Sequence, residues 1–133
     1  MPQTSPTIYP CLLYRDAPAA MLWLTKAFGF NEMMRVPDED GTIRHAEMNL
    51  GPGVIMVGTA RPASGWVSPL DLPAVNQTIS VYVEDVDAHH DRAVAAGAEI
   101  TFPLKTESYG RGYSCKDLEG HTWSFGDYHP TAE

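Results

Sequence analysis

Two residues with acid–base chemistry, His45 and Glu47, stand two positions apart in the segment 42–50. Side chains two apart on an extended strand point to the same face, so the imidazole and the carboxylate should lie side by side. Such a pair suits a general base oriented by its neighbour, or a pair of groups that anchors a substrate. The alternative is a solvated polar face, which alternation on a half-exposed strand also produces.

Aromatic and polar residues on the other expected strands suit a small-molecule pocket, in which rings stack on the ligand and a few polar groups orient it. Arg111 could also lower the pKa of the nearby thiol Cys115, although no histidine is placed to activate that thiol. The predicted ligand-binding residues are Tyr9, His45, Glu47, Trp66, Tyr82, Arg111, Tyr113 and Ser124. If the protein is an enzyme, His45 and Glu47 are the candidate catalytic residues.

The sequence alone leaves more than one role open for several other residues. Trp66 lies in a loop rich in Pro and Gly. A large aromatic side chain in such a loop indicates either a lid over the pocket or a dimer contact. Arg111, between Gly110 and Gly112, suits either an anion clamp or a tight strand entry. The remaining histidines favour structural or solvated positions: His89 and His90 on an exposed helix face, His121 closing a turn, and His129 idle in the tail.

Composition limits the function classes. The chain has 133 residues, with 9 Lys plus Arg against 17 Asp plus Glu, a net charge of −8. Such acidity argues against nucleic acid as a partner. The apolar runs are far shorter than the roughly 20 residues that span a bilayer, and residues 1–6 lack the features of a signal peptide. We therefore expect a cytoplasmic protein in which Cys11 and Cys115 are reduced thiols.

The elements that must position these residues occur in two similar halves. In each half a strand precedes a helix that begins at an aspartate, Asp16 or Asp85, and ends at a glycine, Gly29 or Gly97. Three strands follow each helix. The aspartates lie 69 residues apart and the glycines 68, a fixed offset that indicates an internal repeat. We predict one α+β domain over 1–133, with module one at about 7–58, a linker at about 59–75 and module two at about 76–128.

Two tandem β-α-β-β-β modules resemble the vicinal oxygen chelate superfamily, which includes glyoxalase I, extradiol dioxygenases and bleomycin-resistance proteins. The motifs that carry the resemblance are Tyr9-Pro10-Cys11-Leu12-Leu13-Tyr14-Arg15-Asp16, Ala27-Phe28-Gly29-Phe30, His45-Ala46-Glu47-Met48, Ala95-Ala96-Gly97-Ala98 and Asp117-Leu118-Glu119-Gly120-His121. The resemblance implies a cupped mixed sheet with helices outside, a small-molecule site in the cup, and a homodimer with its modules side by side or exchanged.

Metal-dependent members of that superfamily carry His, Gln or Glu at one position on the first and last strand of each module. The corresponding residues here are Tyr9, Met56, Thr78 and Ser124. None belongs to the His and carboxylate set that divalent metals favour, so no metal or other cofactor is expected.

Alternation then predicts which side chains face the cup. On the segment 42–50 these are His45, Glu47 and Asn49, since Ala46, Met48 and Leu50 are apolar. On the segment 112–117 we expect Tyr113 and Cys115 in the cup, together with Arg111, while Trp123 and Phe125 pack against the helices. The sequence favours a metal-independent small-molecule binding protein. The alternatives are a glyoxalase-like lyase, isomerase or dioxygenase with a non-standard metal site or a His45/Glu47 acid–base pair, and a structural or regulatory dimer without a ligand.

Overall fold

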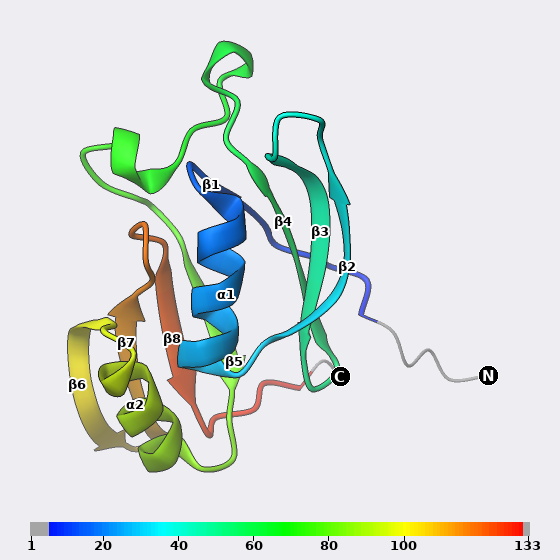
Figure 1. Ribbon diagram of the computed structural model, residues 1–133. Helices are drawn as coiled ribbons and strands as arrows, with labels where there is room; N and C mark the ends of the chain where they lie inside the picture. Colours follow the sequence, from blue (N-terminus) through cyan, green and yellow to red (C-terminus); the bar gives the residue numbers. More distant parts are fainter. Residues whose placement is uncertain (1–5, 132–133) are drawn as a thin grey trace.

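The computed structural model describes residues 6–131 and contains two consecutive β-α-β-β-β modules (Figure 1). Module one consists of β1 (Cys11–Tyr14), α1 (Ala17–Phe28), β2 (Asn31–Pro37), β3 (Ile43–Leu50) and β4 (Gly53–Thr59). Module two consists of β5 (Thr78–Tyr82), α2 (Val86–Ala95), β6 (Glu99–Glu107), β7 (Gly110–Lys116) and β8 (Thr122–Gly126). The segment between the modules holds two short 3-10 turns, η1 (Pro62–Ser64) and η2 (Pro69–Asp71). The predicted α+β fold is confirmed.

The two helices begin by the same local device. The Asp16 carboxylate accepts the amide of Ala19, and the Asp85 carboxylate accepts the amide of Ala88. Each carboxylate thus satisfies one of the amides that a helix leaves unbonded in its first turn. Gly29 ends α1 in the left-handed conformation, with φ of 89°, which a glycine adopts without strain. Over residues 6–131, neither helix is long and apolar enough to cross a membrane.

Each module forms its own four-stranded sheet, in the order β1-β4-β3-β2 in module one and β5-β8-β7-β6 in module two. The first strand of each module pairs in parallel with the last, and the other pairs are antiparallel. Figure 1 shows α1 between the two sheets. One face of each sheet therefore packs on helices, and the opposite face is left open.

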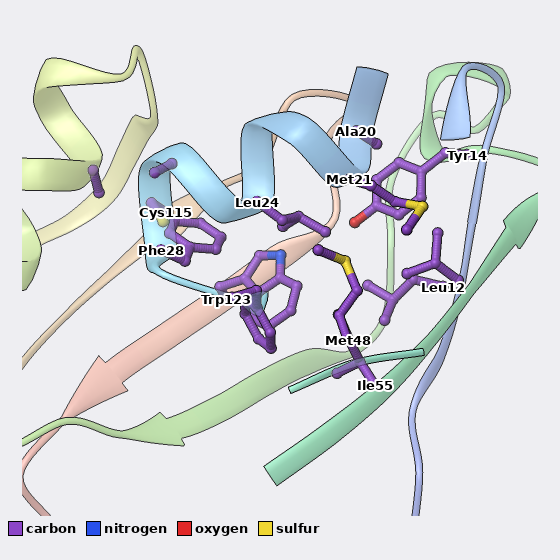
Figure 2. Packing of buried hydrophobic residues seen from close by; sticks show 14 of the residues in the cluster. Leu12, Tyr14, Ala20, Met21, Leu24, Phe28, Met48, Ile55, Cys115 and Trp123 are labelled. Carbon is purple, nitrogen blue, oxygen red and sulfur yellow. The ribbon is translucent and has the colours of Figure 1, made fainter. Parts of the chain in front are cut away.

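The core lies between α1 and the helix-facing side of both sheets (Figure 2). Leu24 and Phe28 of α1 are buried, as are Met48 of β3 and Trp123 of β8. The Phe28 ring lies 5.3 Å from that of Trp123, so a module-one helix fills space against the module-two sheet. Burying an aromatic side chain of this size contributes about 2–3 kcal/mol, and Trp123 is fully buried.

A buried polar junction also joins the modules. Asp117 and Glu119, in the turn between β7 and β8, are 7% and 6% exposed. The Tyr14 hydroxyl and the Trp123 indole N–H both donate to Asp117. Glu119 accepts the hydroxyl of Ser68 from the intermodule segment. Buried carboxylates are costly unless hydrogen-bonded, and these contacts meet that requirement.

Candidate functional site

The open face of the module-two sheet carries a row of hydroxyl groups. Register pairs Ser80 of β5 with Ser124 of β8, Ser124 with Ser114 of β7, and Ser114 with Phe102 of β6. The Ser114 and Ser124 hydroxyl oxygens lie 2.8 Å apart. Directly paired residues share one face of a sheet, so the serine row and Phe102 form a common floor.

Aromatic rings surround this floor. The exposed fractions of Tyr82, Phe102, Tyr109 and Tyr128 are 48%, 69%, 66% and 54%, and all four residues line one cleft of about 780 Å³. The Tyr109 and Tyr128 rings meet nearly at right angles, with centroids 5.9 Å apart. Exposed rings around a concave, partly polar floor are typical of sites for organic ligands. We call this site, defined by the serine row and these four rings, the aromatic cleft.

Each of the two cations that line the aromatic cleft has a carboxylate partner. Lys105 Nζ lies 3.1 Å from Glu107 Oε1, and both residues line the cleft. The Arg111 guanidinium donates two hydrogen bonds to Asp87 at the start of α2, at 2.8 and 3.1 Å. This pairing lowers the pKa of the Asp87 carboxyl and raises that of Arg111. The positive charges of the cleft are therefore largely neutralised.

Two glycines allow β7 and β8 to approach closely beside the serine row. Gly112 and Gly126 are register partners. A Cβ on Gly112 would lie 2.8 Å from the Phe125 carbonyl oxygen, and one on Gly126 would lie 2.9 Å from that of Arg111. Real Cβ atoms do not approach backbone oxygens so closely, so side chains are excluded here.

The predicted pair His45 and Glu47 lies on the other sheet. The His45 Nε2 and Glu47 Oε2 atoms are 2.8 Å apart, as expected for neighbours on one strand face. Glu47 is the register partner of Met56, which in turn pairs with Cys11. The residues that line the aromatic cleft all come from module two and the segment that follows β8. Within one chain, the structure therefore does not bring His45 and Glu47 together with Tyr82 and Ser124.

The predicted position of Tyr113 and Cys115 in the cup is wrong. Both residues are buried, at 3% and 0% exposure, on the face of β7 that packs on α2. Cys115 is the register partner of Trp123, which faces the helices, and directly paired residues must share a face. Burial, followed by the charge of Asp117, raises the pKa of the Cys115 thiol to about 12. This thiol is not an activated nucleophile. Arg111 was also predicted to lie in the cup. It is on the same helix-facing side of β7 as Tyr113, but it reaches the rim of the cleft.

The prediction of a solvated position for His89 is also wrong. Its ring stacks on Phe28 and lies 4.2 Å from that of Phe125. Nε2 donates to the Phe28 carbonyl at 3.0 Å, and Nδ1 accepts the Tyr113 hydroxyl at 2.6 Å. Burial lowers the pKa of His89 and raises that of Tyr113. His89 is thus a neutral link between α2, α1 and β7.

The positions of the three other histidines can also be compared with those predicted from the sequence. His90 is half-buried rather than solvated and contacts the Tyr113 ring edge-on. The ring of His129, which was predicted to be idle in the tail, lies 4.7 Å from that of Tyr82, a residue that lines the cleft. His121 is structural, as predicted, but its imidazole does not close the turn: Nε2 donates to the Leu13 carbonyl of module one at 2.9 Å, and the turn is closed by the backbone hydrogen bond from the Asp117 amide to the His121 carbonyl.

Tyr9 and Trp66 lie away from the aromatic cleft. Tyr9 precedes β1, and its hydroxyl donates to the Pro6 carbonyl. Trp66 is 59% exposed on a small loop closed by backbone hydrogen bonds with Arg61.

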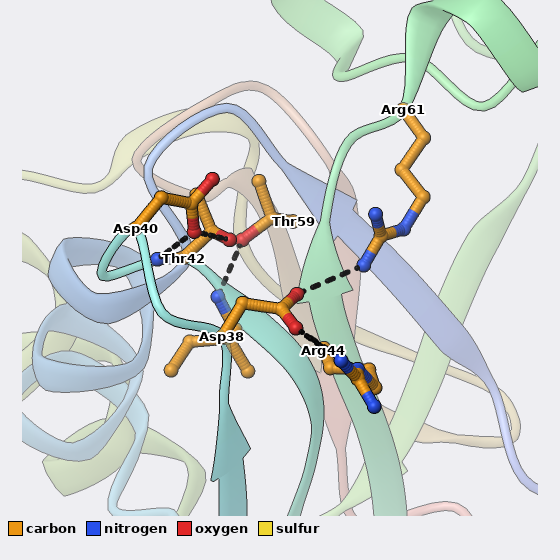
Figure 3. Close-up of polar contacts among 7 residues, drawn as sticks. Asp38, Asp40, Thr42, Arg44, Thr59 and Arg61 are labelled. Atoms are coloured by element: carbon orange, nitrogen blue, oxygen red, sulfur yellow. Dashed lines mark hydrogen bonds and ion pairs between the residues drawn. The ribbon is translucent and has the colours of Figure 1, made fainter.

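Figure 3 shows the side chain of Arg61 reaching Asp38, which Arg44 also contacts. The hydrogen bond from Arg44, followed by that from Arg61, lowers the pKa of the Asp38 carboxyl. These ion pairs tie the loop to the turn between β2 and β3.

The predicted ligand-binding residues did not include Ser114, Phe102, Tyr109 or Tyr128. Ile100, Phe102 and Leu104 alternate as if they shared one face of β6, but the register shifts on both sides of Phe102. Such a bulge moves the ring to the open face, and alternation alone gives no sign of it. Ser114 could have been found from its expected neighbours, because Trp123 and Phe125 face the helices and leave Ser124 and its partner on the open face.

The four positions at which the superfamily places metal ligands do not fit a divalent metal here. They supply the phenol of Tyr9, the thioether of Met56 and the hydroxyls of Thr78 and Ser124. These are weak ligands compared with imidazole or carboxylate, and Tyr9 and Ser124 are already hydrogen-bonded. Within residues 6–131, no three His, Cys, Asp or Glu side chains form a cluster that could hold a metal ion.

Comparison with known proteins agrees with this fold. Residues 8–125 match the Glyoxalase/Bleomycin resistance protein/Dioxygenase superfamily. The chain belongs to that superfamily. An uncharacterised protein of Mycobacterium bovis is 34% identical over 125 residues, which cover 91% of this chain and 82% of that protein.

Two solved structures show the same architecture. TioX from Micromonospora sp. ML1 is 35% identical, with a TM-score of 0.71 over 92% of this chain and 99% of TioX. A variant of the fosfomycin resistance protein FosX from Listeria monocytogenes, solved with Mn(II) and 1S,2S-dihydroxypropylphosphonic acid, has a TM-score of 0.71 over 94% of this chain and 91% of FosX. It is only 16% identical, so it shows the fold alone.

Proposed function

We propose that this chain is a metal-independent small-molecule binding protein that holds an aromatic or amphipathic ligand in the aromatic cleft. One observation carries the proposal: four exposed aromatic rings converge on a concave floor of serine hydroxyls in a cleft of about 780 Å³. Rings stack on an aromatic ligand, and the hydroxyls orient its polar groups. Sequestration of a drug, as the name of the superfamily suggests for some members, is one use of such a site.

The assembly belongs to the same proposal. Chain 1–133 works as one domain in the cytoplasm, and two copies form a homodimer that engages neither nucleic acid nor membrane. Support comes from the open face of the module-one sheet, where Met34 and Val36 are 39% and 38% exposed. A second copy placed on this face would bury these side chains, and light scattering coupled to size-exclusion chromatography tests for the dimer.

A fluorescent probe tests the cleft. We choose a dansyl ring with a neutral pentyl arm, because its emission rises in an apolar site. Phe102→Ala and Tyr82→Ala should each weaken binding about tenfold, since each removes a stacking surface. Leu22→Ala is the matched control, because Leu22 is 74% exposed on α1 and lies outside the cleft. Dialysis against a chelator should leave the affinity unchanged. Equal affinities in all three variants would refute the cleft as the binding site.

A second candidate function rests on the 2.8 Å contact between His45 and Glu47. In that case the pair is the acid–base machinery of a glyoxalase-like lyase or isomerase, in which Glu47 orients the imidazole. Glu47→Gln would then abolish turnover of the substrate but leave probe binding in the aromatic cleft unchanged. A chain that binds no small molecule but forms a stable dimer would instead be a structural or regulatory dimer.

A further inference from the structure

A second row of residues crosses the open face of the module-two sheet beside the serine row. Tyr82 of β5 is the register partner of Gly126 of β8. Gly126 pairs with Gly112 of β7, which in turn pairs with Lys105 of β6. Directly paired residues share one face of a sheet, and all four residues line the aromatic cleft. We call Gly112 and Gly126 the glycine patch.

The glycine patch is bare backbone between two large side chains. A Cβ at either glycine would lie 2.8 or 2.9 Å from a carbonyl oxygen of the neighbouring strand, so neither position accepts a side chain without displacing a strand. The row is therefore flat in the middle and raised at Tyr82 and Lys105. A planar ring makes the most atomic contacts with such a surface when its whole face lies on the backbone.

The spacing between the two sides of the row sets the size of the ligand. Strands β8 and β7 lie between β5 and β6, so Tyr82 and Lys105 are three strand spacings apart, about 14 Å. Side chains of a strand stand roughly perpendicular to the sheet, so these two form opposite walls. Contacts of about 3.5 Å at each wall leave about 7 Å between the outermost atoms of the ligand. Two or three fused six-membered rings have this length, whereas a single ring would leave one wall without a contact.

The serine row closes one end of the glycine patch with polar groups. Ser114 and Ser124 lie two residues along their strands from Gly112 and Gly126, a distance of about 6.7 Å. Their hydroxyl oxygens are 2.8 Å apart, so one hydroxyl donates to the other and the second keeps a proton to donate elsewhere. Because both hydroxyls rise above the bare backbone, that proton is available to an acceptor on the edge of a flat ligand.

We infer that the ligand is a flat aromatic system of two or three fused rings, which lies on the glycine patch and directs a carbonyl or similar acceptor on its edge toward Ser114 and Ser124. This inference rests on the proposed function, because it assigns the shape and polarity of the ligand to that same site. Lys105 and Glu107 contact one another at the β6 wall, so the hydroxyls are the polar groups that the floor offers to the ligand.

Three ketones that differ in ring number test the size of the ligand. These are 4-pyranone, chromone and xanthone, which have one, two and three fused rings and share a carbonyl and a ring oxygen. Equilibrium dialysis gives their affinities, and displacement of the dansyl probe with the pentyl arm shows whether they occupy the cleft. Binding should tighten about tenfold with each added ring, because each buries more apolar surface.

A fourth ketone tests whether the ring lies flat. In 10,10-dimethylanthrone the three rings and the carbonyl remain, but one methyl group projects from each face. The compound is more apolar than xanthone, so a nonspecific apolar surface would bind it more tightly. On the glycine patch a methyl group would hold the rings away from the backbone, and we expect binding about tenfold weaker than that of xanthone.

Serine variants test the edge acceptor. Ser114→Ala combined with Ser124→Ala should weaken xanthone about fivefold and leave dibenzofuran, a flat three-ring ether without a carbonyl, unchanged. Ser64→Ala is the matched control, because Ser64 is an exposed serine of η1 outside the cleft. Thermal unfolding of the parent and the variants confirms that all are folded.

The outcomes separate this inference from the function beneath it. If the pentyl probe binds in the aromatic cleft but the ketones of one, two and three rings bind equally, or xanthone does not displace the probe, the fused ring is refuted and the proposed function stands. Equal binding of xanthone and 10,10-dimethylanthrone refutes the flat pose. Equal losses for xanthone and dibenzofuran in the serine variant, or an equal loss of xanthone affinity in Ser64→Ala, refute the edge acceptor. If neither the pentyl probe nor xanthone binds, the proposed function fails and the inference fails with it.

Discussion

The Glu119 carboxylate accepts the amide of Asp16 at 2.8 Å across 103 residues of sequence. Its other oxygen accepts the amide of Arg15 at 2.6 Å. A side chain of the last turn in module two thus completes the hydrogen bonding at the start of α1 in module one. Glu119 is 6% exposed, so water cannot easily replace it.

Glu119→Gln should therefore destabilise the whole chain. A glutamine has one acceptor oxygen in place of two, and its amide group would oppose one of the backbone N–H groups. We expect the free energy of unfolding in urea to fall by about 1–3 kcal/mol. Glu39→Gln, which changes an exposed carboxylate, should leave it unchanged. A Glu119→Gln variant as stable as the parent would show that the junction does not hold the modules together.

The stability of the fold should fall in mild acid because of His89. Burial lowers the pKa of this imidazole in the folded chain, so the unfolded chain binds a proton at a higher pH than the folded chain does. The contribution of His89 is complete above about pH 6.5, the pKa of an unfolded histidine, and declines as the pH falls below it. The lowered pKa values of Glu32, Asp38 and Asp87 act at lower pH, below about 4.5.

Urea unfolding at several pH values between about 7.5 and 5 checks this expectation. His89→Gln keeps a donor and an acceptor for Phe28 and Tyr113 but does not titrate. It should have a shallower dependence of unfolding free energy on pH than the parent chain. Parallel curves for the two proteins would contradict the assignment to His89.

The two cysteines should differ sharply in reactivity. Cys11 is exposed, whereas Cys115 is fully buried, with its thiol pKa raised to about 12. Since only the thiolate attacks a disulfide reagent, Ellman's reagent at about pH 8 should modify Cys11 quickly and Cys115 only after unfolding in urea. Cys11→Ser should therefore show almost no reaction in the native state. A fast native reaction in that variant would place Cys115 in an open site.

Gly112→Ala should destabilise the module-two sheet, because the added Cβ would lie 2.8 Å from the Phe125 carbonyl oxygen. Displacing β8 to relieve this contact should cost about 1–3 kcal/mol. Gly53→Ala is the control: its Cβ would lie 3.4 Å from the nearest atom, so its effect should be much smaller. Thermal unfolding of the two variants compares them, and an equal fall in Tm would mean that the close approach of β7 and β8 is not required.

Local chemistry made the fold predictable from sequence. Asp16 and Asp85 each start a helix within three residues, and Gly29 ends one, so these signals do not depend on distant parts of the chain. The face of His45 and Glu47 was also predictable, because these residues alternate with the buried Ala46 and Met48 in the second half of β3.

The site was harder to predict because its geometry depends on register. A bulge beside Phe102 reversed the face that alternation indicates, and Arg111, Tyr113 and Cys115 carry no apolar alternation that marks their side of β7. The junction of Glu119 with Arg15 and Asp16 joins segments more than 100 residues apart. Nothing in the local pattern around either segment identifies the other.

The start of α1 depends on Glu119, a residue that is synthesised much later than the helix itself. A ribosome releases module one first, yet the carboxylate that satisfies the amides of Arg15 and Asp16 emerges 103 to 104 residues later. Until then the amides of Arg15 and Asp16, just before α1, must remain hydrated, and Phe28 lacks Trp123 to pack against. The nascent chain therefore gains its native stability only near the end of translation, when the last hairpin leaves the ribosome.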